Sequence, residues 1–144
     1  MLSRGTRRGW RRGFTLIEVL IVVVILAVLA ATVVPQYKDV TNDAKYNTTV
    51  FNLQGMRAQI ELYKAQHNGN PPAALSDLTI STDVSGAPGP DYGPYMINIP
   101  TENITGSSTT SAQSPINVTG TTGGWAYDAA SGEVRINHTS YSTL

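Results

Sequence analysis

The sequence contains no cysteine and only two histidines, His67 and His138. A chain without cysteine forms no disulfide, no cysteine-ligated zinc site and no cysteine nucleophile. The two histidines are far apart in the sequence, so we interpret each as a surface residue or a structurally satisfied one. Stability must therefore come from packing or from a bound ion.

Paired carboxylates and phosphate-binding glycine loops are also missing. The acidic residues are spread singly, and Asp91 beside a Gly/Pro-rich stretch is typical of a turn rather than of an acid–base pair. Asp83, Asp91 and Glu102 are too scattered to indicate the six to eight oxygen ligands that calcium prefers. We therefore predict that the chain is not an enzyme and has no cofactor and no metal site.

Acidic residues are absent from residues 1–13, which carry five of the ten Lys and Arg residues of the chain: Arg4, Arg7, Arg8, Arg11 and Arg12. A basic flank beside an apolar segment holds that end of the chain in the cytoplasm. Removal of these 13 residues leaves a chain with a formal charge of −5, which is not expected to bind nucleic acid.

Polar residues are scarce in the stretch that follows. Between Phe14 and Val34 they are Thr15, Glu18 and Thr32. A helix of 21 residues, at about 1.5 Å per residue, just crosses a hydrocarbon core of roughly 30 Å. An acidic residue within the bilayer costs about 2.5–3.5 kcal/mol and is usually there to meet a partner. We predict a membrane-spanning helix over residues 14–35.

A secretory signal peptide is the alternative for this stretch, with Val28-Leu29-Ala30 as a small-residue cleavage site. The apolar run is longer than the roughly 7–15 residues of a signal peptide and contains Glu18, and both features argue against that alternative.

The segment Arg12-Gly13-Phe14-Thr15-Leu16-Ile17-Glu18 resembles the processing site of type IV pilins and type II secretion pseudopilins. The resemblance implies cleavage after Gly13 by a prepilin peptidase, N-methylation of Phe14 and a role for Glu18 in assembly. Pro35 falls where many of these proteins kink their long helix. Adhesive type IV pilins commonly carry a C-terminal disulfide, so the absence of cysteine favours a pseudopilin.

Residues 36–67 have the pattern of an amphipathic helix. Apolar residues recur at steps of three or four: Tyr46, Val50, Leu53, Met56, Ile60 and Tyr63. We interpret this stripe as the seat of a β-sheet rather than a cofactor or partner groove. Pro35 need not end the helix, because a proline within a helix kinks it. We predict one kinked helix from Phe14 to Gln66 that stops at His67-Asn68-Gly69-Asn70-Pro71-Pro72.

Residues 68–144 are predicted to form one small globular head. We expect a short helix over residues 72–78 and a mobile loop or insertion over residues 106–114. The predicted strands are Tyr95–Pro100, Ile116–Thr119, Trp125–Tyr127 and Glu133–His138, the last two forming a hairpin whose apolar side faces the helix stripe. The predicted fold class is α+β, with a long kinked N-terminal helix and a small C-terminal antiparallel sheet packed on it.

These features predict a structural subunit, a pseudopilin or pilin, that polymerises into a type II secretion pseudopilus or a type IV pilus-like filament. Its expected partners are other copies and related subunits, the prepilin peptidase and the inner-membrane assembly platform. We expect a bacterial inner-membrane protein with a cytoplasmic N-terminus and a periplasmic head. A non-polymerising membrane-tethered binding domain is the alternative, and Glu18, which a plain tether does not need, argues against it. An anchored enzyme is a third possibility without a catalytic constellation.

Overall fold

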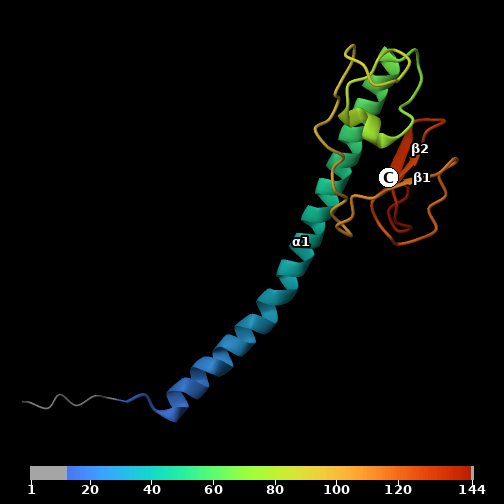
Figure 1. Ribbon diagram of the computed structural model, residues 1–144. Coiled ribbons are helices and arrows are strands. Elements are labelled where there is room, and N and C mark those ends of the chain that lie inside the picture. Colours follow the sequence, from blue (N-terminus) through green and yellow to red (C-terminus); the bar gives the residue numbers. More distant parts are fainter. Residues whose placement is uncertain (1–12, 144) are drawn as a thin grey trace, which may run out of the picture. The chain divides into compact units, whose positions relative to one another are not determined.

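The computed structural model describes residues 13–143, apart from the side chains of residues 34–36 and 39. Helix α1 runs from Leu16 to Gln66, and it is followed by a short 3-10 helix, η1, over Leu75–Thr79. Strands β1 (Thr110–Ala112), β2 (Trp125–Asp128) and β3 (Glu133–Ile136) complete the order of elements along the chain (Figure 1). The fold is α+β, as predicted.

The chain divides into two compact units, residues 1–40 and 41–144. Within the first unit, the described side chains from Phe14 to Val33 are all exposed. The backbone of α1 is helical at position 35, so Pro35 does not end the helix. Because the side chain of Pro35 lies outside the described residues, the kink stays a prediction.

Helix α1 ends where the turn residues predicted it. Asn68 and Gly69 both have positive φ angles, 56° and 85°. The amide of Gly69 donates to the carbonyl oxygen of Lys64 at 2.8 Å, which satisfies a carbonyl of the last helical turn. The prolines that follow do not continue the helix.

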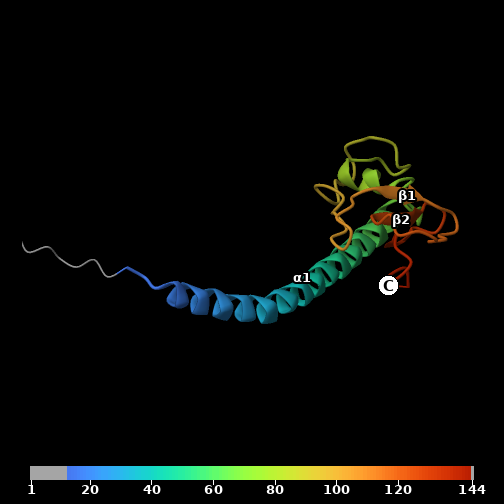
Figure 2. The same cartoon turned by 90° about the horizontal axis from the view of Figure 1, so that it is seen from below.

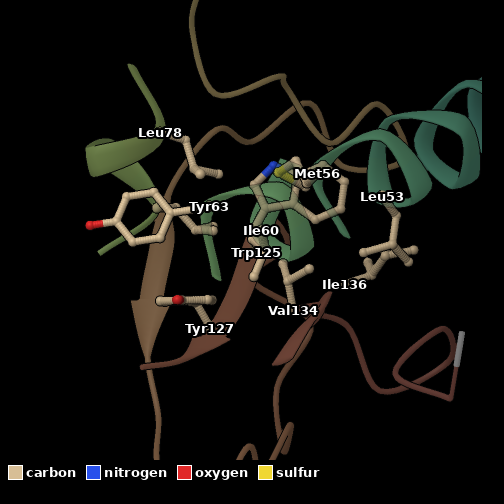
Figure 3. Close-up of a cluster of buried hydrophobic side chains, with 10 residues drawn as sticks. Leu53, Met56, Ile60, Tyr63, Leu78, Trp125, Tyr127, Val134 and Ile136 are labelled. Carbon is tan, nitrogen blue, oxygen red and sulfur yellow. The ribbon is translucent and has the colours of Figure 1, made fainter. Parts of the chain in front are cut away.

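In the second unit, the sheet packs on the C-terminal half of α1 (Figures 1 and 2). The predicted stripe supplies Leu53, Met56, Ile60 and Tyr63, all at most 2% exposed. Figure 3 shows these side chains facing Trp125, Tyr127, Val134 and Ile136 of the hairpin. In the register of the two strands, Trp125 pairs with Ile136 and Tyr127 with Val134, so one apolar side of the hairpin covers the helix. Tyr46 and Val50 are only partly buried.

The antiparallel sheet that we predicted is wrong in one respect. Strands β2 and β3 are antiparallel, but β1 pairs with β2 in parallel, so the sheet is mixed. Strand β1 comes from the segment that we expected to be a mobile loop or insertion. Nothing in Thr110–Ala112 alternates between apolar and polar residues, and the strand forms because β2 offers it a free edge.

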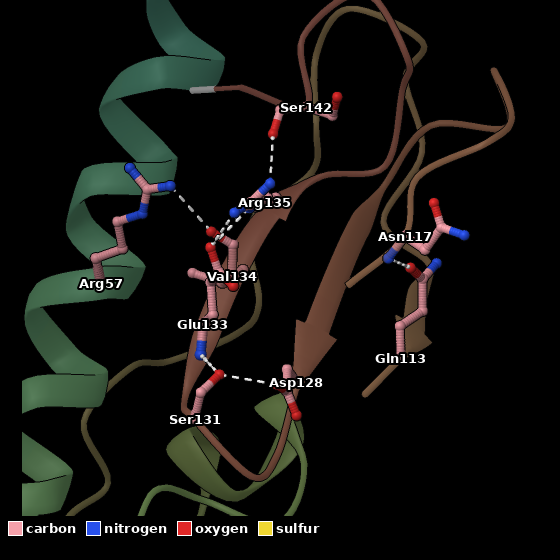
Figure 4. Close-up of polar contacts among 9 residues, drawn as sticks. All are labelled: Arg57, Gln113, Asn117, Asp128, Ser131, Glu133, Val134, Arg135 and Ser142. Atoms are coloured by element: carbon pink, nitrogen blue, oxygen red, sulfur yellow. Dashed lines mark hydrogen bonds and ion pairs between the residues drawn. The ribbon is translucent and has the colours of Figure 1, made fainter. Parts of the chain in front are cut away.

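Two of the predicted strands are also wrong. Tyr95–Pro100 and Ile116–Thr119 have no regular structure. The amides of Tyr95 and Met96 both donate to the carbonyl oxygen of Leu78 at 2.9 Å, which bends the backbone away from a strand ladder. The amide of Asn117 donates to Oε1 of Gln113 at 2.8 Å, so it bonds to a side chain instead of a neighbouring strand (Figure 4).

Candidate processing and assembly site

The predicted processing residues, Gly13 and Phe14, lie just before the first turn of α1. Both are exposed, with Phe14 at 88%, and a Cβ atom added at Gly13 would meet nothing within 4 Å. Neither residue belongs to the helix, which begins at Leu16. The Gly13–Phe14 bond therefore lies outside regular structure and is exposed.

Glu18 folds back onto the start of α1. Its Oε2 atom accepts hydrogen bonds from the backbone amide of Thr15 at 2.7 Å and from the Thr15 hydroxyl at 2.8 Å. In return the amide of Glu18 donates to Oγ1 of Thr15 at 3.3 Å. This reciprocal pair is a capping box, which satisfies two of the amides that every helix leaves unpaired at its N-terminus.

Thr15 is the residue of this site that our reading of the sequence missed. The signal was present, because Thr15 and Glu18 have the spacing of a capping box ahead of an apolar run. The consequence is that Glu18 has two separable properties. Its side-chain oxygen caps the helix, and its negative charge lies near the positive end of the helix dipole.

Beyond the cap, α1 presents an apolar surface on every side. The span Leu16–Val33 is long and apolar enough to cross a membrane, judged by length and composition, and none of it is buried within the protein. A helix that is apolar all round must be covered by lipid or by other helices. Pro35, the third predicted assembly residue, lies just past this span, and its side chain is outside the described residues.

Two of the three acidic residues considered for a calcium site, Glu102 and Asp83, have other roles. Glu102 is fully buried, and its carboxylate accepts hydrogen bonds from the amides of Ile104, Thr105 and Gly124 and from the Thr105 hydroxyl. Asp83 accepts from the hydroxyl and amide of Ser85 and the amide of Ala87, and these bonds hold the pKa of Asp83 below its usual range. In the part of the chain that the structure describes, no three His, Asp or Glu side chains gather as a metal site.

His67 is a buried structural residue. Its Nδ1 lies 2.8 Å from the carbonyl oxygen of Tyr63, and its Nε2 lies 2.9 Å from Oγ1 of Thr82. The imidazole also stacks on the Tyr63 ring, with the ring centroids 3.7 Å apart. Both ring nitrogens are therefore engaged, as we predicted for a structurally satisfied histidine.

The sequence that forms this site matches a known sequence motif. Residues 11–34 match the prokaryotic N-terminal methylation motif. The methylation motif thus spans the Gly13–Phe14 bond, the capping box and the apolar span. It indicates the type IV pilin-like class of structural proteins, and it implies prepilin peptidase processing and pilin-like assembly. Together with the apolar span it indicates a membrane-anchored protein. No curated protein and no solved structure matches the chain significantly.

Proposed function

We propose that this chain is a pilin-like structural subunit. Prepilin peptidase cuts between Gly13 and Phe14, the new amino group of Phe14 is methylated, and the apolar half of α1 holds the subunit in the inner membrane with its head in the periplasm. Subunits then polymerise through this half of the helix into a filament. The observation that carries the proposal is the coincidence of the methylation motif, at residues 11–34, with an apolar span whose described side chains are all exposed.

The filament is proposed to be a type II secretion pseudopilus or a type IV pilus-like fibre. The absence of cysteine favours the pseudopilus, because adhesive pilins commonly need a disulfide to close a C-terminal loop. The described part of the head instead ties its loops to α1 and to the sheet by packing and hydrogen bonds. Trp125 Nε1 donates to the carbonyl oxygen of Pro100 at 2.7 Å, and the Tyr95 hydroxyl donates to Oε1 of Gln66 at 2.6 Å.

Glu18 is proposed to select the position of each subunit in the filament. In the free subunit the capping box and the helix dipole stabilise its charge near the membrane surface. In a filament core an unpaired carboxylate is costly, unless it meets the protonated Phe14 amine of a neighbouring copy. That pairing favours one stagger of adjacent helices over the others.

N-terminal sequencing of the protein extracted from its own membrane tests the processing step. We expect the chain to begin at a methylated Phe14. A chain that began at Ala31 instead would have been cut by signal peptidase after Val28-Leu29-Ala30, and that result would refute the proposed function. Recovery of filaments that contain the chain separates a polymerising subunit from a membrane-tethered binding domain.

A further inference from the structure

Strand β1 is an open edge of the sheet. It has β2 on one side, and within the described residues no strand pairs with its other side. The carbonyl oxygen of Thr109 accepts from β2 at 2.8 Å, and the amide of Gln113 donates to β2 at 2.9 Å. Because alternate residues of a strand bond to the same side, the N–H and C=O groups of Thr110 and Ala112 face away from β2. No described residue pairs with these outward backbone groups.

A groove with apolar walls lies beside the outward backbone groups. The side chains of Thr110 and Ala112 lie on the same face of the sheet as their partners in β2, Trp125 and Tyr127. Trp125 and Tyr127 are at most 2% exposed and pack in the core with α1, whereas Thr110 and Ala112 are exposed. The face that is covered at β2 is therefore open at β1. The groove there has a volume of about 260 Å³. Its walls include Ala73, Leu75, Ile99, Ala112 and Tyr127.

The edge and the groove together define the chemistry of an occupant. An unpaired row of backbone donors and acceptors bonds to an extended peptide, which offers the same groups at the same spacing. The groove is smaller than the roughly 300–1,000 Å³ of small-molecule sites, so it fits side chains of such a peptide better than a separate ligand. The residues that line the groove are uncharged, and the sequence has no charged residue between positions 103 and 127. A charged side chain would lose water there without gaining a partner.

We propose that the open edge of β1 binds an uncharged extended peptide of a partner protein by β-augmentation. The peptide adds a strand beside β1, bonds to the backbone of Thr110 and Ala112, and places an apolar side chain in the groove. A helix does not fit this edge, because its backbone groups are already paired within the helix. Since the edge is three residues long, binding is weak and reversible.

Binding is measured on the detergent-solubilised full chain, with a capped five-residue peptide of alternating threonine and leucine. We expect saturable binding with a dissociation constant on the order of 1 mM. The amides of Thr110 and Ala112 should exchange with solvent about tenfold more slowly in the complex, because they become hydrogen-bonded. The same peptide with glutamate in place of leucine should not bind, and neither should a peptide with methylated backbone nitrogens, which keeps its side chains but cannot donate.

Ala112→Pro removes one outward donor from the edge. This N–H does not bond to β2, so the melting temperature should change little, while peptide affinity should fall by about tenfold. Ala112→Leu keeps the N–H but fills the groove, and it should also weaken binding. Ala129→Pro is the matched control, since it makes the same substitution at an exposed residue of the β2–β3 turn and should leave peptide affinity unchanged.

The absence of saturable binding, or equal affinities of the wild-type and Ala112→Pro chains, would overturn the inference. If Ala112→Pro lowers the melting temperature, the affinity of Ala112→Leu and the exchange of the two amides decide in its place. A dimer in sedimentation that Ala112→Pro abolishes would assign the edge to a second copy of the chain, and it would also overturn the inference. These measurements require neither cleavage after Gly13 nor filaments, so their outcome is independent of the proposed function.

Discussion

Glu18→Gln is expected to leave membrane insertion intact and to abolish assembly. Glutamine retains a side-chain oxygen at the place where Glu18 accepts from the amide and hydroxyl of Thr15, so the capping box can persist. Loss of the charge favours membrane insertion. The gain should be smaller than the cost of about 2.5 kcal/mol for an acidic residue at the bilayer centre, because Glu18 lies at the end of the span.

The expected loss on assembly is larger. In our proposal the Phe14 amine of a neighbouring copy is left buried and unpaired. Breaking a buried ion pair by removing one partner costs about 3–5 kcal/mol, which corresponds to a roughly 100- to 4,000-fold weaker association. Filament recovery should therefore fall below detection while the amount of processed subunit in the membrane stays at or above the wild-type level.

Thr15→Val is the matched control for helix capping. Valine has nearly the shape of threonine but lacks the hydroxyl that accepts from the amide of Glu18 at 3.3 Å, so the cap is weakened while the charge of Glu18 is kept. Loss of an N-cap costs about 0.5–2 kcal/mol, which frays the first turn of the helix without removing the ion pair. We expect this variant to assemble.

Membrane fractionation and filament recovery are measured together, and N-terminal sequencing shows that both variants are cut after Gly13. Normal filament recovery from Glu18→Gln would refute the pairing role and leave Glu18 as an interfacial, helix-capping residue. Failure of both variants would show that assembly needs the cap as well as the charge.

The remaining predictions concern the head. Gly132→Ala should destabilise the protein by about 2–5 kcal/mol in urea denaturation, since the residue has a φ of 77° and a new Cβ would lie 2.9 Å from Pro71. Gly106→Ala has the same φ of 77° but nothing within 4 Å of its new Cβ, so it should lower the free energy of unfolding by only about 1–2 kcal/mol. Equal losses of stability in the Gly132→Ala and Gly106→Ala variants would contradict the steric explanation. Tyr127→Phe should lower the free energy of unfolding by about 1–3 kcal/mol, because the buried carbonyl oxygen of Pro72, which the Tyr127 hydroxyl binds at 2.6 Å, is left unpaired. An unchanged midpoint of urea denaturation would refute this expectation. The amide of Ala130 and the hydroxyls of Ser114 and Ser131 lower the pKa of Asp128 in the folded protein. The folding stability that ionised Asp128 contributes should therefore be fully present above the unfolded pKa of about 3.9, and it should be lost as the pH falls through the lower folded pKa. Asp128→Asn should remove that part of the acid sensitivity in pH-dependent melting curves. A fragment starting at residue 36 should be a folded monomer in sedimentation, and filaments formed by it alone would show that the apolar span is not the assembly element.

Local patterns in the sequence were sufficient for the helix and the hairpin. The apolar stripe of α1 and the alternation of Trp125 with Tyr127 and of Val134 with Ile136 are periodic, and each period belongs to one kind of structure. The turn between the strands is also local. The amide of Ala130 and the hydroxyl of Ser131 both donate to the carboxylate of Asp128 at 2.9 Å.

Strand β1 could not be predicted from local patterns, because it forms by pairing with strand β2. The amide of Trp125 donates to the carbonyl oxygen of Thr109 at 2.8 Å, and the amide of Gln113 donates to that of Tyr127 at 2.9 Å. These bonds flank a three-residue strand whose own side chains are exposed or half-buried. Its position depends on where β2 lies, which a local pattern does not contain.

Thr49 is a second residue whose position local patterns did not predict, although the apolar period of α1 was predicted correctly. It lies on the buried side of α1 with no exposed surface, although an apolar pattern omits it. Its hydroxyl donates to the carbonyl oxygen of Lys45 at 2.9 Å and accepts from the amide of Asn103 at 3.0 Å.

A buried threonine is tolerated only when its hydroxyl is paired, so this position requires the loop beside it to be in place. That loop is in turn held by buried Glu102, whose carboxylate accepts from the amides of Thr105 and Gly124. Such bonds join the helix, the loop and the start of β2 without a disulfide. In the described part of the head, each buried side-chain nitrogen and oxygen atom has a hydrogen-bond partner, so the burial of these polar groups is compensated within the protein.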